Sequence, residues 1–289
     1  METGPPLLDR VSNEGVAVVP LADAWGTTPE QLREAAAASP FSFVARLLGV
    51  EPLLVERQPI RPVHEGRSFA STRRATPLHT DSQLFLQVPA AIQILVCVKA
   101  ARRGGESVLV DGARVAARLQ REDPALAAAL YTDDRRQRFY FGEVDGPTVA
   151  LRGGHLAWTY APGADDEVGR ALAHAVSAEP SFVHRLADGE ALLASNHRML
   201  HGRTPFEGER ELARLLVWLE HPLAADAAQL TRARVVTPAP RPEALAKLRA
   251  VLAILRGVPP AKVASEAHVP EATLYGWREA FMRGGCSSL

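Results

Sequence analysis

His79 and Asp81 stand two residues apart in the segment PLHTDSQLF. On a β-strand, side chains two positions apart leave the same face, with Cα atoms roughly 6.5 Å apart, so both could bind one metal ion. His201 follows 122 residues after His79 (201 − 79), in the segment SNHRMLHGRTPF, and offers a third ligand. Two histidines and one carboxylate form the facial triad of mononuclear non-heme iron oxygenases, which leaves positions on Fe(II) open for other ligands.

These residues also have purely structural interpretations. His79 and Asp81 could form a hydrogen-bonded pair at a strand end, and His201 could cap the turn before Gly202. His197 lies four residues before His201 and is expected to support the site or the fold rather than to bind metal. The remaining histidines are interpreted as structural or surface residues: 64, 155, 174, 184, 221 and 268.

Arg214 lies inside the apolar segment LARLLVWLEH. A charge buried in a strand is costly unless it is paired, so this position indicates an anion nearby. Arg210 shares the same strand face if the strand is regular, but it follows the turn signal EGE and is expected nearer the exposed end. Arg214 is the favoured anion-binding residue; a surface pair with Glu211 or Glu220 is the alternative.

Four motifs occur in order: LHTD, GGESVLVDG, SNHRMLHGRTPF and the Arg214 strand. Together they resemble the Fe(II)/2-oxoglutarate-dependent dioxygenases of the taurine dioxygenase and γ-butyrobetaine hydroxylase type, over roughly residues 10 to 222. The resemblance implies that His79, Asp81 and His201 hold iron. It also implies that Arg214 binds the distal carboxylate of 2-oxoglutarate, with Arg210 as the competing arginine, and that Ser107 touches the cosubstrate.

The resemblance further implies the reaction. 2-Oxoglutarate is converted to succinate and CO2 while an unactivated C–H of a small molecule, or of a peptide- or carrier-bound residue, is hydroxylated. Related halogenases lack the carboxylate ligand. Because Asp81 is present, hydroxylation is expected, with desaturation or ring formation as variants.

The composition fits an enzyme without a polyelectrolyte or membrane partner. The chain has 289 residues, 47% of them hydrophobic, and a formal net charge of zero. No global charge attracts it to nucleic acid or membranes. Two cysteines, Cys97 and Cys286, form no disulfide framework. The N-terminus lacks the features of a signal peptide and no apolar run reaches the roughly 18 residues of a membrane span. A cytoplasmic location is expected.

Many short strands separated by Gly and Pro turns indicate a double-sheet β structure with helices on its flanks. The predicted fold is α+β, with a double-stranded β-helix (jelly-roll) core, as the resemblance also implies. Helices are predicted over residues 28 to 39, with Thr28 as N-cap, over 40 to 49, over 111 to 131 and near 165 to 178. Residues 57 to 78 are predicted as a loop over the site, and this loop together with 132 to 163 and 202 to 209 is expected to shape the substrate pocket. Arg73, Arg74 and Arg152 suggest an anionic group on the substrate; the alternative is that they face solvent.

The C-terminal part is predicted to be a separate all-α domain. The expected division is a dioxygenase domain over residues 1–225, a Pro-rich linker over 226–242 and a three-helix, helix-turn-helix-like domain over 243–289, with helices near 243 to 256, 260 to 267 and 271 to 283. From residue 241 on, seven Lys or Arg stand against four Glu, a net charge of +3. Such a mild charge supports only weak DNA binding. Docking of a protein or self-association is therefore favoured over contact with nucleic acid.

Two functional hypotheses follow. The first is an oxygenase whose C-terminal domain helps to recruit a substrate or partner. The second is a DNA-associated regulator whose sheet domain senses iron, oxygen or 2-oxoglutarate. The complete ligand set and Arg214 favour the oxygenase.

Overall fold

The structure is a computed structural model and describes residues 6–63, 66, 68–139, 142–163, 166–237 and 242–285. His64, Cys286 and residues 238–241 of the predicted linker lie outside these residues.

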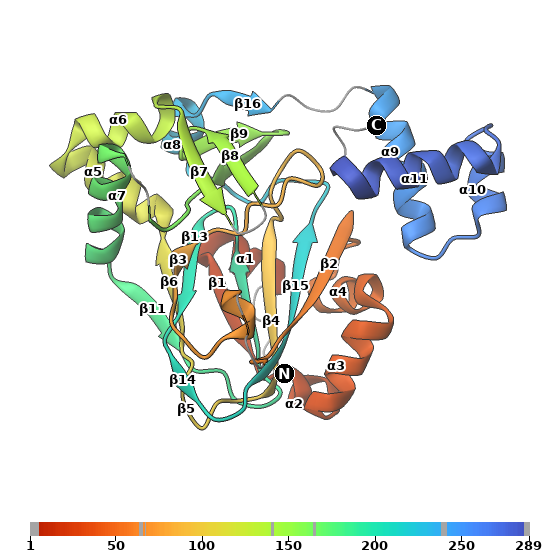
Figure 1. The fold of residues 1–289 in the computed structure, drawn as a ribbon, viewed down its shortest axis with the longest axis horizontal. Coiled ribbons are helices and arrows are strands. Elements are labelled where there is room, and N and C mark those ends of the chain that lie inside the picture. The colour runs from red at the N-terminus through yellow and green to blue at the C-terminus, as the bar shows by residue number, and fades with distance from the viewer. Residues whose placement is uncertain are drawn as a thin grey trace.

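Two antiparallel sheets pack face to face in the centre of the molecule (Figure 1). The larger sheet has the strand order β1-β12-β4-β15-β2 and the smaller one β11-β6-β13-β3. Leu95, Leu192 and Leu212 of the larger sheet pack with Leu109 and Met199 of the smaller one. The strands are β1 (Val16–Val19), β2 (Leu54–Ile60), β3 (Thr76–His79), β4 (Ile92–Lys99), β6 (Ser107–Asp111), β11 (Ser181–His184), β12 (Ala191–Ser195), β13 (Met199–Arg203) and β15 (Glu211–Trp218).

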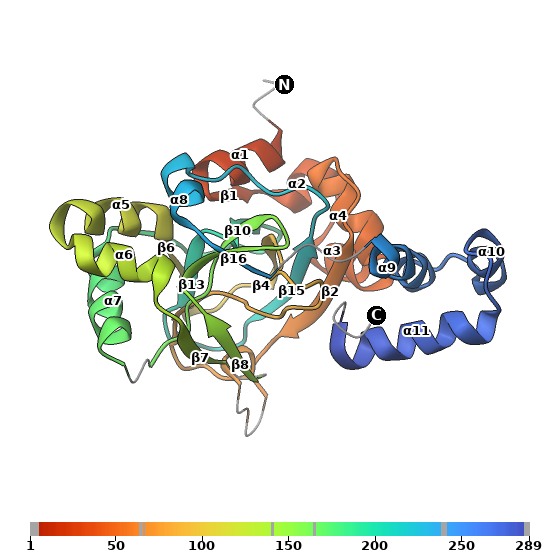
Figure 2. The same cartoon turned by 90° about the horizontal axis from the view of Figure 1, so that it is seen from above.

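Helices cover both outer faces, so the molecule has four layers (Figure 2). Leu32 and Phe43 belong to the apolar core on the outer face of the larger sheet, which is covered by α1 (Leu7–Glu14), α2 (Leu21–Trp25), α3 (Pro29–Ala38) and α4 (Pro40–Leu48). Val115 and Leu172 belong to the corresponding core of the smaller sheet, covered by α5 (Gly112–Glu122), α6 (Pro124–Thr132) and α7 (Glu167–Ala178).

The local signals explain where these helices begin and end. The Thr28 side chain accepts a hydrogen bond from the backbone N–H of Gln31, and the Gln31 side chain returns to Thr28, which confirms the predicted N-cap. The single helix predicted over 111 to 131 is two helices. Pro124 has no N–H to continue a helix, and the Asp123 side chain caps the new one.

Short strands extend from the central layers: β5 (Arg103–Gly104) pairs with β14 (Phe206–Glu207), β7 (Arg135–Phe139) pairs with β8 (Gly142–Gly146), and β9 (Val149–Arg152) lies between β10 (His155–Trp158) and β16 (Val235–Thr237). The segment predicted as a linker thus carries β16 and the helix α8 (Ala227–Arg232). The segment predicted as a loop from residue 57 likewise begins inside β2, and contains the 3-10 helix η1 (Phe69–Ser71).

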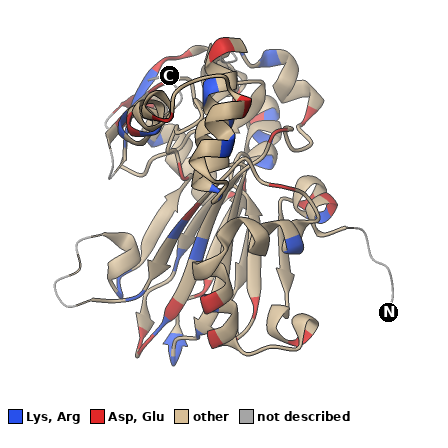
Figure 3. Cartoon of the chain, turned by 90° about the vertical axis from the view of Figure 1, so that its right-hand side faces the viewer, with Lys and Arg blue, Asp and Glu red and all other residues tan. Residues whose placement is uncertain are grey.

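The three predicted C-terminal helices are present as α9 (Pro242–Leu255), α10 (Pro260–Glu266) and α11 (Glu271–Gly284). Leu252 and Phe281 of these helices share a hydrophobic core with Leu86, Val88 and Trp218. Cationic and anionic residues are mixed on these helices rather than sorted onto one face (Figure 3), and several pair with each other: Lys247 with Glu243, Lys262 with Glu266, and Arg283 with Glu279.

Among the described residues, no helix combines the length and apolar character that crossing a membrane requires.

Candidate metal centre and adjoining pockets

The three predicted ligand residues lie together at one end of the smaller sheet. His79, the last residue of β3, stands directly opposite His201 on β13. Asp81 lies two residues beyond β3, and one donor atom from each of the three side chains falls within 4.8 Å of the others. Asp81 was expected on the same strand as His79. The strand ends before it because the Asp81 backbone N–H donates to Asn196 Oδ1, at 2.9 Å, instead of to a neighbouring strand.

Two buried amides that the sequence analysis did not single out fix this arrangement. Asn196, in the turn between β12 and β13, donates from Nδ2 to the Asp81 carbonyl oxygen at 2.7 Å and to that of Ala90 at 2.8 Å. Gln93 Nε2 donates to Asp81 Oδ2 at 2.6 Å and lies 2.9 Å from His201 Nε2. A polar Gln93 inside the apolar run AAIQILV was the sequence signal for the second of these.

A glycine beside His201 allows β13 to approach β3 closely. A Cβ at Gly202 would lie 2.6 Å from the Thr76 carbonyl oxygen. The pairing of the two strands shifts in register between His201 and Arg203 at this point. The small residue in the motif HGR therefore lets the two histidines stand side by side, with ring centroids 4.5 Å apart.

The protonation states suit metal binding. Burial and the neighbouring His201 lower the pKa of His79 to about 4, so its imidazole is neutral at physiological pH. The His79 Nδ1 lies 2.9 Å from the Pro77 carbonyl oxygen, which favours a proton on Nδ1. The lone pair of Nε2 is then available to bind a metal ion. Burial alone would raise the pKa of Asp81, but the charge of Arg214 and a hydrogen bond with His201 hold it well below its usual range.

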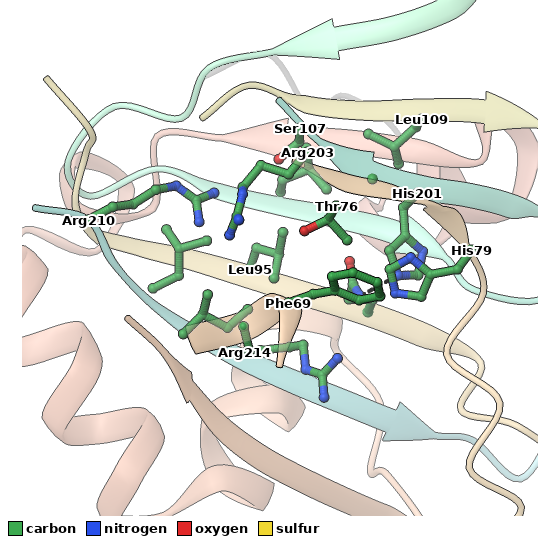
Figure 4. A pocket seen from close by; sticks show the side chains of 16 residues that line it. Phe69, Thr76, His79, Leu95, Ser107, Leu109, His201, Arg203, Arg210 and Arg214 are labelled. Atoms are coloured by element: carbon green, nitrogen blue, oxygen red, sulfur yellow. Dashed lines mark hydrogen bonds between the residues drawn. The ribbon is translucent and has the colours of Figure 1, made fainter. Parts of the chain in front are cut away.

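An inner cavity extends from these residues between the two sheets. Figure 4 shows His79 and His201 at one end of it and Arg210 at the other, with Ser107 and Arg203 nearby and Leu95 between the ends. Arg210 is buried, and burial together with Arg203 lowers its pKa to about 10. Within the described part of the chain no carboxylate forms an ion pair with Arg210. Its guanidinium donates a long hydrogen bond of 3.5 Å to the Gly105 carbonyl oxygen and lies over the Phe206 ring.

Arg214, in contrast, already has an anionic partner. Its Nη1 donates to Asp81 Oδ1 at 2.9 Å, and its Nη2 donates to Gln58 Oε1 at 2.5 Å. The alternative surface partners are engaged elsewhere, since Glu211 pairs with Arg33 and Glu220 with Arg249.

A second pocket, the outer pocket, adjoins the inner cavity and shares Phe69, Ala70, His79 and Arg214 with it. Its remaining lining is Glu56, Gln58, Ser68, Thr80, Asp81, Gln83, Arg138, Phe139 and Pro162. Segments 57 to 78 and 132 to 163 contribute to this outer pocket, while segment 202 to 209 contributes Gly202 and Arg203 to the inner cavity.

Other predicted residues lie away from both pockets. Arg73 donates to the Gly208 carbonyl oxygen, Arg152 is buried beside the Asp145 carbonyl oxygen, and neither these nor Arg74 is part of the described lining. His197 Nε2 lies 2.8 Å from the Pro89 carbonyl oxygen and does not join the ligand cluster.

Sequence and structure comparisons match this arrangement to known proteins. The family model described as taurine catabolism dioxygenase TauD, TfdA family matches residues 11–216, and a homeodomain-like domain model matches residues 241–289. A uridine-5'-phosphate dioxygenase from Amycolatopsis sp is 33% identical over 144 residues, which cover 43% of this chain and 52% of that protein. The chain therefore spans about half the length of this curated relative.

Solved structures show the same fold. Asparagine oxygenase in complex with Fe(II), 2S,3S-3-hydroxyasparagine and succinate has a TM-score of 0.52 at 18% identity, and the match covers 76% of this chain and 83% of that one. Another asparagine oxygenase structure has a TM-score of 0.51 at 18% identity, covering 75% and 82%. At such identities the likeness concerns the fold alone.

Proposed function

Since the chain belongs to the TauD/TfdA family of Fe(II)/2-oxoglutarate-dependent dioxygenases, we propose that it hydroxylates a C–H bond of a small polar molecule at His79, Asp81 and His201. The observation that carries the proposal is the convergence of these three side chains, with donor atoms within 4.8 Å of one another, at the junction of two pockets. One pocket is available for the cosubstrate and the other for the substrate.

The residues fit a ferrous ion. Two neutral imidazoles and an ionised carboxylate are the donor set that Fe(II) takes in the facial triad, and three protein ligands leave room for a chelating keto acid and oxygen. When bound, Fe(II) with 2-oxoglutarate activates O2, so that the keto acid is oxidised to succinate and CO2 and one oxygen atom is inserted into a C–H bond. Gln93 donates to the Asp81 carboxylate, and Asn196 holds the backbone of Asp81 through its N–H and its carbonyl oxygen. A carboxylate at this position favours hydroxylation over halogenation.

We assign the distal carboxylate of 2-oxoglutarate to Arg210 rather than to Arg214, which sequence analysis favoured. Arg210 is buried at the far end of the inner cavity (Figure 4) and has no carboxylate partner among the residues that the structure describes, whereas Arg214 is already paired with Asp81. A buried guanidinium is stable only with an anion, and it stays charged to bind one bidentately. Ser107, buried and lining the same cavity, is a second candidate contact for the cosubstrate.

Within the proposal, the two facing sheets form the double-stranded β-helix core of the enzyme, and the C-terminal helices are a docked accessory domain. The boundaries 1–225, 226–242 and 243–289 remain the proposed division. The mixed charges of the C-terminal helices support a protein contact or self-association rather than DNA binding. The regulator hypothesis has no comparable support, because a sensor would not need the full ligand set.

Oxygen-dependent turnover tests the proposal. The purified protein with Fe(II) and 2-oxoglutarate should form succinate slowly without substrate, and His201→Ala should not. The matched control is His174→Ala, on the exposed side of α7. The proposal would be contradicted by a wild-type protein that forms no succinate, either alone with Fe(II) and 2-oxoglutarate or after addition of small-molecule extracts.

A further inference from the structure

The outer pocket carries an unusual set of polar groups on β2. Every second residue of this strand lies on one face: Leu54, Glu56, Gln58 and Ile60. In the pairing with β15, Glu56 stands opposite Leu216 and Gln58 opposite Arg214. Leu54 and Ile60 pack in the hydrophobic cores, so this is the inward face. Two polar residues therefore replace apolar ones where the strand passes the proposed iron site.

Glu56 lacks a partner. Its Oε2 atom is buried and accepts no hydrogen bond from the described residues. Burial, with the charge of Asp81 adding to it, raises the pKa of the Glu56 carboxyl, while Arg214 opposes the shift. A buried carboxylate oxygen without a hydrogen-bond donor destabilises the fold. Such an oxygen is expected where a bound ligand supplies the missing donor.

Gln83 provides a second acceptor of the same kind. It follows Asp81 by two residues and lines the same pocket, and its Oε1 is also buried without a hydrogen-bond partner among the described residues. One carboxylate and one amide oxygen, both lacking donors, match a group with several N–H donors and a positive charge. An ammonium has three donors and no acceptor.

The same pocket holds a complementary donor. Arg214 uses Nη1 for Asp81 and Nη2 for Gln58, but its Nε is buried and has no hydrogen-bond partner in the described part of the chain. This Nε–H is available to donate to an anionic oxygen of a bound ligand.

The charges of the pocket disfavour a doubly anionic ligand. Glu56 and Asp81 carry two negative charges against the positive charge of Arg214, because the exposed Arg138 pairs with Glu143, and His79 is neutral. The charges of Fe(II) and of the 2-oxoglutarate dianion cancel. A dianionic phosphate would add two negative charges beside two carboxylates, whereas a zwitterion adds none.

We propose that the outer pocket binds a free amino acid, with its ammonium group at Glu56 and Gln83 and its carboxylate at Arg214, so that its side chain faces the proposed iron site. This inference rests on the proposed function only for the reaction. The recognition itself comes from the unpartnered atoms of Glu56, Gln83 and Arg214.

Binding to the anaerobic holoenzyme tests the inference. The protein with Fe(II) and 2-oxoglutarate is titrated with each common protein amino acid and with uridine 5'-phosphate, and binding is measured by calorimetry and by the change in visible absorption. For the best ligand, the N-acetylated and carboxamide derivatives are compared. We expect one or a few amino acids to bind, and each derivative to bind about tenfold more weakly or worse, because each loses a charged hydrogen bond.

Glu56→Gln separates recognition from folding and from the metal site. It keeps the shape of the side chain and removes its charge, and the exposed Glu51→Gln is the matched control. The Glu56 variant should weaken amino-acid binding about tenfold or more while the Kd of 2-oxoglutarate stays unchanged. It should bind the N-acetylated derivative as the wild type does.

The outcomes distinguish the two proposals. If the Fe(II)–2-oxoglutarate absorption band does not form, the proposed function fails. If the band forms but no amino acid binds, if uridine 5'-phosphate binds instead, or if Glu56→Gln leaves amino-acid binding unchanged, the amino-acid inference alone is overturned.

Discussion

Arg214 and Asp81 form an ion pair across the two sheets, with Nη1 of the arginine on β15 2.9 Å from Oδ1 of the carboxylate that follows β3. The protein thus supplies the anion that the apolar surroundings of Arg214 require. Arg210, four residues earlier and directly before β15, is the buried cation that still lacks a carboxylate among the described residues.

The two arginines should therefore differ in their effect on the cosubstrate. Arg210→Ala should raise the Kd of 2-oxoglutarate by about 30-fold or more, since removing one member of a buried charge pair costs about 2 to 5 kcal/mol. Arg214→Ala should change this Kd less and weaken the capture of substrate. Anaerobic titration of the Fe(II) protein measures both. A large effect of Arg214→Ala on 2-oxoglutarate with little effect of Arg210→Ala would restore the sequence-based assignment.

Asp81→Gly tests the carboxylate ligand. Removing it should abolish hydroxylation, because the proposed iron ligand and the ion-pair partner of Arg214 are lost together. Added chloride should restore part of the iron binding if it fills the open position. Product analysis with and without chloride measures this, and undiminished hydroxylation would mean that another carboxylate binds the metal.

Phe281→Ala tests the docking of the C-terminal helices. Phe281 is 3% exposed in the core shared with Trp218, whereas its neighbour Met282 is 65% exposed. The substitution should lower the free energy of unfolding by about 3 kcal/mol or more, and Met282→Ala should leave it nearly unchanged. Denaturant unfolding provides the measurement. Equal effects of the two variants, or a chain truncated after Thr237 that is as stable and soluble as the full chain, would argue for an independent module.

His197 should make the fold sensitive to acid. Burial and the neighbouring His155 lower the pKa of His197 to about 3, below its value of roughly 6.5 in an unfolded chain. Between these values the unfolded state binds a proton that the folded state does not, so stability falls as the pH falls through this window. The loss due to His197 from pH 7 to pH 5 is about 2 kcal/mol. His197→Gln should flatten the pH dependence of the unfolding free energy, and the exposed His174→Gln should not; parallel curves for all three proteins would contradict this account.

Local signals predicted much of the fold. The N-cap at Thr28, the glycine after Leu48 and the spacing of apolar residues in the last three helices depend on neighbours in sequence, and these elements are present. The convergence of His79, Asp81 and His201 was also predictable, because four motifs occur together in order, although each motif alone is weak evidence.

What depended on distant contacts was not predictable. The end of β3 before Asp81 is set by Asn196, 115 residues away (196 − 81). Gln58 was interpreted as part of a loop that begins at residue 57, because the two inward polar residues Glu56 and Gln58 hide the alternation of β2. The different partners of Arg210 and Arg214 depend on how the two sheets face each other. The apolar spacing in α9 and α11 predicted a buried face, but it could not predict that this face packs on Trp218.

The most direct measurement for the central claim is an anaerobic absorption spectrum of the protein titrated with Fe(II) and 2-oxoglutarate. The wild type should develop the visible metal-to-ligand charge-transfer band of the chelate before any substrate is added. His79→Ala should lose the band, and the exposed His174→Ala should keep it. A wild-type protein that binds neither iron nor 2-oxoglutarate, or a His79→Ala variant with an unchanged band, would contradict the assignment of His79, Asp81 and His201 as the iron site.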